Sequence, residues 1–200
     1  MSFMRRFESF MGWLLYNRKG LDALLFTNKP MFTDVPQSID VDCTEPDVTD
    51  HLLKRHTPFG EDRFPSLAWK TDGATQAKVR EFVVLAQDLD VPLPRPALHG
   101  SFYAIPASQH TLTDEDIRGV EEGKGTLMYG KTMMNVRYIA ARPLVDHGEH
   151  RYVYMVVGLS EPLHLPFKAP LKQIEAAMAG KIVAYGKWTG AYGRTWDGEC

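Results

Sequence analysis

Acidic, imidazole and guanidinium side chains gather in VDHGEHRYVYMVV, residues 145–157, where a polar start passes into an apolar run. Charged groups are rarely buried unless they are paired, so this segment is either a solvated strand end or one wall of a site. Two imidazoles and an arginine can bind a phosphate or carboxylate through charge-assisted hydrogen bonds. The polar residues concerned are Asp146, His147, Glu149, His150 and Arg151.

Two further segments place polar side chains beside apolar runs. Asp88 and Asp90 follow one run, and His99 begins the next. Because one antiparallel strand ends beside the start of its neighbour, we expect these residues and His150 to meet at one rim of a sheet. Such a set could bind an anion or perform general acid–base chemistry. The alternative is structural: the aspartates cap a turn, His99 is a core histidine and Arg151 pairs with an acid.

No other constellation of residues competes with this rim. The sequence contains no G-x-S-x-G elbow, no Walker loop and no C-x-x-C pair. His147 and His150 are three residues apart, but they precede a strand rather than lie on a helix, which disfavours a zinc site. We therefore expect no metal and no cofactor. Cys43 and Cys200 form no disulfide framework, which favours a reduced compartment, and we expect a cytoplasmic protein.

The overall composition is that of an ordinary globular domain. The chain has 200 residues, 44% of them hydrophobic, and a formal net charge of -2. That charge gives no general attraction to nucleic acid or to an anionic membrane, so neither is an expected partner. No apolar run approaches the ~20 residues that a membrane-spanning helix needs, so no integral membrane association is expected.

The N-terminal segment has the periodicity of an amphipathic helix. Gly20 is a plausible end to the helix, and we expect it to pack on the body of the protein as a unit within residues 1–30. Contact with a membrane surface is the alternative, but the polar face is not basic enough to favour it. A targeting presequence is also disfavoured, because Glu8 interrupts the basic start. The apolar face comprises Phe3, Phe7, Phe10, Met11, Leu14 and Leu15.

The remainder, residues 31–200, has the texture of a single β-rich domain. Short apolar runs alternate with Pro, Gly and Asp clusters, which favours a β sandwich or barrel. The continuous apolar run at 80–88 predicts a strand buried on both faces. Other strands are expected at 66–69, 99–106, 151–159 and 181–193, and short helices at 113–119 and 171–180.

Five motifs follow one another in a distinctive order along the chain: PSLAW, DLDVP, HGSFYAIP, YIAARPLVDHGEHRYVY and GKWTGAYGR. This order resembles the phosphatidylethanolamine-binding protein family, and the motif ARPL…HGxHRYxY resembles its fungal branch. The resemblance covers about residues 38–194. It implies a large antiparallel sheet packed on a smaller one, an N-terminal and a short C-terminal helix, and a pocket for phosphate-type head groups.

The resemblance also implies which residues form the pocket. His150 would point inward, Arg151 would form a structural pair, and His147 would lie on the surface. The implied ligand-binding residues are Asp88, Asp90, His99, Tyr138, Arg142, His150 and Tyr152, with Met133, Met134 and Leu144 lining the pocket.

This sequence departs from the family pattern at several pocket positions. Side chains replace glycine and proline in the pocket loop, which narrows the floor or changes its turn, and methionines add adaptable apolar lining. Two explanations are open. Either the changes are drift in a surface loop, or they reshape the pocket for a molecule more apolar than a phospholipid head group. The departures are Leu89, Ala140, Ala141, Arg142 and the pair Met133–Met134.

Three functions follow from the resemblance. The first is a binding or regulatory module for a small-molecule or phosphate-bearing ligand, with room for a protein partner or a homodimer. The second is a metal-free, cofactor-free lyase, isomerase or cyclase acting on a hydrophobic metabolite, a biosynthetic role in which His99 is the acid or base and Asp88 and His150 assist. The third is a peptidase inhibitor that acts through its surface.

Overall fold

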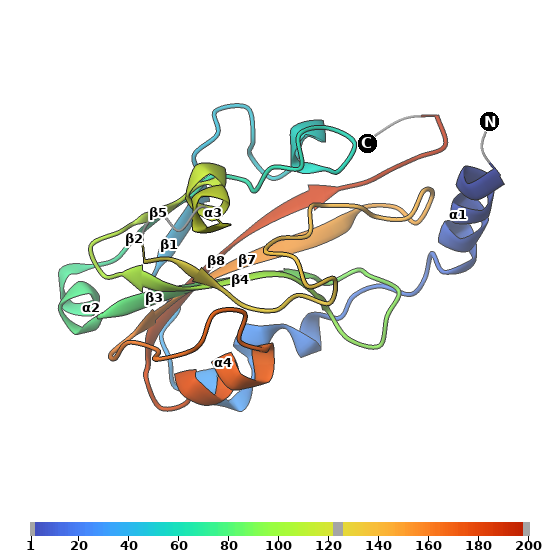
Figure 1. Ribbon diagram of the computed structural model, residues 1–200. Helices are drawn as coiled ribbons and strands as arrows, with labels where there is room; N and C mark the ends of the chain where they lie inside the picture. The colour runs from blue at the N-terminus through green and yellow to red at the C-terminus, as the bar shows by residue number, and fades with distance from the viewer. Residues whose placement is uncertain (1–2, 122–125, 198–200) are drawn as a thin grey trace.

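The computed structural model describes residues 3–121 and 126–197, and it shows a mainly β fold with two antiparallel sheets (Figure 1). In the larger sheet the spatial order of strands is β6-β4-β3-β7-β8. These strands are β3 (Glu81–Asp88), β4 (Ala97–Pro106), β6 (Met128–Tyr129), β7 (His150–Leu159) and β8 (Ile182–Tyr192). The smaller sheet has the order β1-β2-β5, with β1 (Asp40–Cys43), β2 (Leu67–Lys70) and β5 (Thr111–Leu112). The sandwich expected from the sequence is confirmed.

The larger sheet is buried on both faces. Val84 and Ala86 of β3 face the cluster that contains Trp69 of the smaller sheet. Val83 and Leu85 face the opposite cluster, which includes α4 (Leu171–Met178). Every residue of β3 is buried, because other elements pack on both faces of the sheet at this strand. This explains why its sequence is a continuous apolar run and does not alternate.

Short helices close the ends of the sandwich. In α3 (Asp114–Glu121), Thr113 and Asp116 cap each other reciprocally, each side chain accepting from the other's backbone N–H. The sequence analysis missed α2 (Gly73–Lys78), β1, β5 and β6, each of them short. The 3₁₀ turns are η1 (Asp22–Leu24), η2 (Phe26–Asn28), η3 (Pro30–Phe32) and η4 (Lys54–His56).

The N-terminal helix α1 (Phe3–Leu14) lies at one end of the larger sheet, beside the loop that precedes β7 (Figure 1). The helix was expected to pack on the body through its apolar face, but much of that face points outward. The exposed residues are Phe3, Phe7, Phe10 and Leu14. The helix instead contacts the body through Gly12, its one buried residue.

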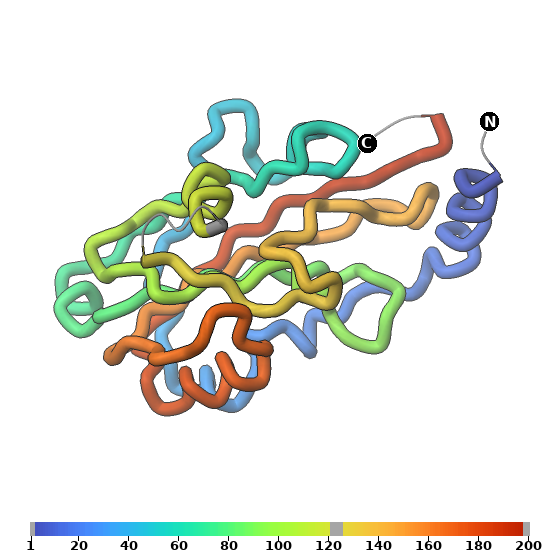
Figure 2. The backbone as a smooth tube through the Cα atoms, in the orientation of Figure 1, coloured from blue at the N-terminus to red at the C-terminus, as the bar shows by residue number. Residues whose placement is uncertain are grey.

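The reason for this orientation is a close backbone approach combined with polar pairing. A Cβ atom on Gly12 would lie 1.9 Å from the carbonyl oxygen of Val145, so only glycine allows the contact. One turn earlier, Glu8 pairs with Arg194 at 2.6 Å. The chain then continues from α1 along the sheet toward α4 (Figure 2). Among the described helices, none is both long and apolar enough to cross a bilayer.

Candidate functional site

A buried row of polar side chains runs along the end of the larger sheet. Antiparallel pairing of β3 with β7 places Asp88 opposite Tyr152, two residues beyond His150. As a result His150 Nδ1 lies 2.8 Å from Asp88 Oδ2, and both side chains are almost fully buried. The end of β3 and the start of β7 therefore lie side by side, as expected, and this pair joins them.

The row continues through a second histidine to the N-terminal helix. His147 Nδ1 lies 2.7 Å from His150 Nε2, and His147 Nε2 lies 2.8 Å from the carbonyl oxygen of Leu15. The family resemblance implied a surface position for His147, and this is wrong: its exposed fraction is 0%. The physical reason is that residues 8–21 cover the loop in which it lies.

The three hydrogen bonds of the row fix its protonation. A carbonyl can only accept, so His147 Nε2 donates to Leu15 O, and His147 Nδ1 then accepts from His150 Nε2–H. The third proton lies between His150 Nδ1 and Asp88. Burial, and then the nearby His150, lowers the pKa of His147, which agrees with a neutral imidazole there.

His99 stands beside this row with a different set of partners. Its Nδ1 lies 2.6 Å from the carbonyl oxygen of Ile139, so Nδ1 carries the proton. Burial lowers the pKa of His99, which leaves Nε2 as an unprotonated nitrogen 4.0 Å from Asp88 Oδ2. That nitrogen is a proton acceptor without a hydrogen-bond donor among the described residues.

Tyr152 completes the group. Its ring meets that of His99 edge to face with centroids 5.1 Å apart. Burial raises the pKa of Tyr152 well above its ordinary value, so the group remains a donor O–H. Within the described chain that buried O–H donates to no acceptor, although the backbone N–H of Arg142 is near enough to its oxygen to oppose the rise of the Tyr152 pKa. Native structures contain few such atoms, and an unobserved ligand or water is a common explanation. We call Asp88, His99, His147, His150 and Tyr152 the polar cluster.

Asp90, expected in the same pocket, turns away from the polar cluster. Its carboxylate accepts from Arg151 Nε at 2.8 Å and from the backbone N–H of Gly20 at 3.0 Å. Burial raises the pKa of Asp90 and the hydrogen bonds of Arg151 lower it, and the balance lies below the ordinary value. Arg151 also binds Asp22 at 2.8 Å, so its expected structural pairing is confirmed.

Residues 8–21 form a strap over the polar cluster. Besides the contacts of Gly12 and Leu15, the strap is held by Ser9, whose hydroxyl donates to Asp146, and by the Leu21 N–H, which donates to Leu89 O at 2.9 Å. Each residue of the polar cluster is no more than 7% exposed. Sequence reasoning missed the strap; the signal was Gly12, a helix-weakening residue inside an apolar helix.

The other expected site residues lie apart from the polar cluster. The Tyr138 hydroxyl pairs with that of Tyr154 at 2.8 Å, and Leu144 is half-buried. Met133 and Met134 are exposed, and Arg142 extends over the ring of Phe59. Tyr138, Arg142 and Met134 line a separate groove of about 330 Å³, which none of the polar cluster enters. In the described part of the chain, no group of three or more His, Cys, Asp or Glu side chains could hold a metal ion.

Comparison with known proteins identifies the family. The model of the family described as phosphatidylethanolamine-binding protein matches residues 44–193. The chain belongs to the phosphatidylethanolamine-binding protein family. It is 34% identical over 206 residues to a fungal "Phomoidride biosynthesis cluster protein B", with 97% of both chains covered. A protein of the same name from Talaromyces stipitatus is 29% identical and covers 97% of this chain, with 84% of that protein aligned.

Other similar proteins align with a smaller share of this chain. A "UPF0098 protein" of Aquifex aeolicus is 32% identical, covering 72% of this chain and 82% of its own. The solved structure of YbcL from Escherichia coli has a TM-score of 0.68 at 19% identity, covering 78% of this chain and 98% of its own. A homologue from Chlamydia trachomatis has a TM-score of 0.64 at 16% identity, covering 79% and 99%.

The difference in coverage concerns the strap. The family match begins at residue 44, whereas the fungal relatives align with 97% of the chain and so include most of residues 1–43. This chain is thus a family member of fungal type, and its strap lies in the part that the general family model does not match.

Proposed function

We propose that this protein is a binding module for a small anionic ligand, of the phosphate head-group type, that is held by the polar cluster. The observation that carries the proposal is the buried hydroxyl of Tyr152, which donates to no acceptor in the described chain and lies beside the His99 ring. A ligand oxygen would satisfy this donor.

His150 supplies the second donor. In the closed arrangement its Nε2–H is accepted by His147 Nδ1 at 2.7 Å. An anionic oxygen is a better acceptor than a neutral imidazole, because a hydrogen bond between charged partners is shorter and stronger. Asp88, on the other side of the ring, is hydrogen-bonded to His150 Nδ1 at 2.8 Å and holds the imidazole so that Nε2 faces His147. The ligand would therefore take the place of His147.

Replacement of His147 requires the strap to move. The strap holds His147 through Leu15 O at 2.8 Å, and Gly12 packs on the same loop. The ligand binds only molecules in which the strap is open, so the apparent affinity falls as the open fraction becomes smaller. A change that weakens the strap should therefore make the protein bind the ligand more tightly.

Calorimetric titration with phosphorylethanolamine and with inorganic phosphate tests the proposal. We expect saturable binding that is lost in His150→Ala, weakened in Tyr152→Phe and strengthened in His147→Ala. Arg95→Gln, a change at an exposed arginine, is the matched control and should leave binding unchanged. Heat of binding that persists in His150→Ala, or no heat at millimolar ligand, would refute it.

A second candidate function is proton transfer on a small hydrophobic metabolite. The favouring observation is the tautomer of His99, whose Nδ1–H donates to Ile139 O at 2.6 Å and leaves Nε2 as a base. The names of the fungal relatives, which place those proteins in a biosynthetic cluster, agree with a role of this kind.

Ring opening of 5-nitrobenzisoxazole, in which a base removes a C–H proton as the N–O bond breaks, is a suitable general probe. Turnover above that of buffer should disappear in His99→Ala and remain in Arg95→Gln. Equal rates in the wild type and His99→Ala would remove this candidate. A cytoplasmic location and a peptidase-inhibitor role remain proposals that this probe does not address.

A further inference from the structure

A second concave site lies next to the polar cluster but is separate from it. The groove of about 330 Å³ is bounded by the loop at Pro58, by α3 at Ile117 and by the segment from Met134 to Arg142. We propose that this groove binds a small molecule that has an apolar portion and a single carboxylate. The proposal is independent of the function assigned to the polar cluster, because no side chain of that cluster lines the groove.

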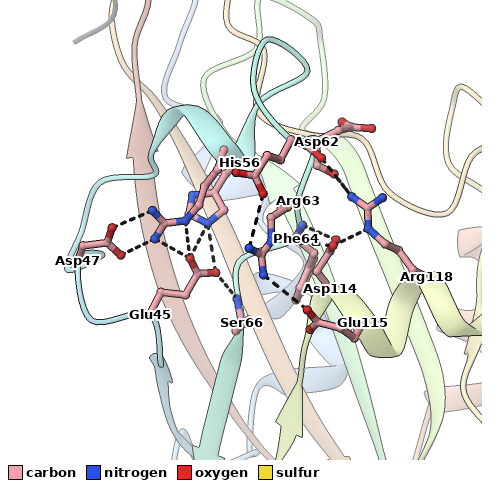
Figure 3. A network of polar contacts seen from close by, with 12 residues as sticks. Glu45, Asp47, His56, Asp62, Arg63, Phe64, Ser66, Asp114, Glu115 and Arg118 are labelled. Carbon is pink, nitrogen blue, oxygen red and sulfur yellow. Dashed lines mark hydrogen bonds and ion pairs between the residues drawn. The ribbon is translucent and has the colours of Figure 1, made fainter.

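The wall formed by the loop and α3 is fixed by polar contacts (Figure 3). Asp114 at the start of α3 accepts from the Phe64 N–H at 3.0 Å and pairs with Arg118. Arg63 forms an ion pair with Glu115 of α3, with 3.7 Å between the guanidinium Nη2 and the carboxylate Oε1. The groove is therefore largely preformed, as small-molecule sites usually are, and its volume lies within their usual range of roughly 300–1,000 Å³.

The opposite side of the groove carries apolar side chains that are open to solvent, beside Arg137 and Arg142. Val136 and Met134 line it, with exposed fractions of 41% and 66%, and Ile117 forms a buried part of its floor. Exposed apolar side chains gathered at a concave site often mark a binding surface. A flexible methionine adapts to a ligand's shape, which suits an alkyl or similar chain.

The charges of the groove favour one carboxylate. Asp114 is neutralised by its partner Arg118, whereas Arg142 has no ion pair among the described residues. Its guanidinium lies 5.7 Å from the ring centroid of Phe59. Arg194, 4.2 Å from the same centroid, is already paired with Glu8. Arg142 can therefore bind a carboxylate through two parallel hydrogen bonds.

Asp62 and Arg137 also line the groove, and their opposite charges offset each other, so Arg142 supplies one unbalanced positive charge. A ligand with acids at both ends would bring one more negative charge than the lining balances. Octanoate, with one alkyl chain and one carboxylate, accordingly represents the expected class of ligand. Two comparison compounds differ from it in charge: 1-octanol has no carboxylate, and octanedioate has a second one.

Titration of the full-length protein with these three probes, followed by NMR of the methionine methyl groups, tests the proposal. Octanoate should shift the Met134 methyl saturably and the neighbouring Met133 methyl less, since Met133 does not line the groove. Arg142→Gln should weaken octanoate binding by about tenfold, the effect expected for one charge-assisted hydrogen bond. The matched variant Arg95→Gln should not change it. Octanol and octanedioate should bind more weakly than octanoate.

Two further variants separate this site from the polar cluster. Val136→Trp, at a partly exposed position, should block the groove, whereas His150→Ala should leave octanoate binding intact. The proposal is overturned by an absent shift at millimolar octanoate, by equal affinity in Arg142→Gln, or by loss of binding in His150→Ala without loss in Val136→Trp.

Discussion

His147 Nδ1 lies 2.7 Å from His150 Nε2 and accepts a hydrogen bond from it, so one buried imidazole fills the acceptor position beside another. His147 is in turn held by the carbonyl oxygen of Leu15, the residue that follows α1. The polar cluster is thus satisfied from within by a residue that depends on the N-terminal strap. This relationship connects the position of α1 to the availability of His150.

The first prediction concerns the contact of α1 with the loop. Gly12→Ala places a Cβ atom 1.9 Å from Val145 O, and because that atom is backbone the helix must shift. We expect backbone amides of residues 3–21 to exchange hydrogen faster, and stability to fall by about 1–3 kcal/mol, as for other overpacked contacts. Hydrogen exchange measured by mass spectrometry reports both the site and the extent of opening.

Gly73→Ala is the control for this change, because a Cβ atom at Gly73 meets nothing within 4 Å. It should leave exchange in residues 3–21 unchanged. Exchange in Gly12→Ala that matched the wild type throughout the strap would contradict the packing described here.

The second prediction compares two buried tyrosines. Tyr152→Phe removes a hydroxyl that donates to no acceptor in the described chain, so the free energy of unfolding should stay constant or rise by about 1 kcal/mol. Tyr138→Phe leaves the Tyr154 hydroxyl unpaired and should cost about 1–3 kcal/mol. Urea denaturation measures both. A larger loss in Tyr152→Phe than in Tyr138→Phe would show that the Tyr152 hydroxyl is bonded after all.

The third prediction is a loss of stability in acid from buried histidines. Burial lowers the pKa of His56, His99 and His147 below the ordinary value of 6.5. Their stabilising effect is therefore fully present above pH 6.5, where they are neutral in both states. It is lost as the pH falls through their folded pKa values, because the unfolded chain then binds more protons. Unfolding measured between pH 8 and pH 5 should show this decline.

His99→Gln isolates one of these groups. Its amide can still donate to Ile139 O but cannot titrate, so the slope of stability against pH should fall by up to one proton, about 1.4 kcal/mol per pH unit. Stability that rose as the pH fell from 7 to 5, or a slope unaffected by this substitution, would contradict the neutral assignment.

The fourth prediction assigns Asp90 and Arg151 a structural role. Arg151→Met leaves the buried Asp90 carboxylate without its cation. Since the arginine is partly exposed, we expect a loss of about 2–3 kcal/mol, below the range for a fully buried pair. Lys181→Met, which breaks a solvent-exposed pair with Glu161, should cost less than about 1 kcal/mol. Equal losses in thermal denaturation would contradict this role.

The fold followed from local patterns wherever a strand was long. The apolar run at 80–88 predicts a doubly buried strand, and β3 is buried throughout. The segments β1, β5 and β6 escaped prediction because each has four residues or fewer, too short for a periodicity to form, although the equally short β2 was expected at 66–69. The helices expected at 113–119 and 171–180 correspond to α3 and α4.

The site was harder to predict, because periodicity shows that a helix has an apolar face but not what that face contacts. In α1 the close approach of Gly12 and the pairing of Glu8 orient the helix, and its aromatic residues remain exposed. The burial of His147 follows from that orientation. Nothing in the local sequence around His147 distinguishes it from a surface histidine.

The most direct test of the account is NMR of ¹⁵N-labelled imidazoles in the wild type during titration with inorganic phosphate. We predict that phosphate breaks the hydrogen bond between His147 and His150. The ¹⁵N chemical shift of His147 Nδ1 should then move to the value of an unprotonated nitrogen that accepts no hydrogen bond, while His150 Nε2 stays protonated. Phosphate that binds saturably while both signals remain unchanged would show that the anion is held elsewhere and that His147 does not occupy its place.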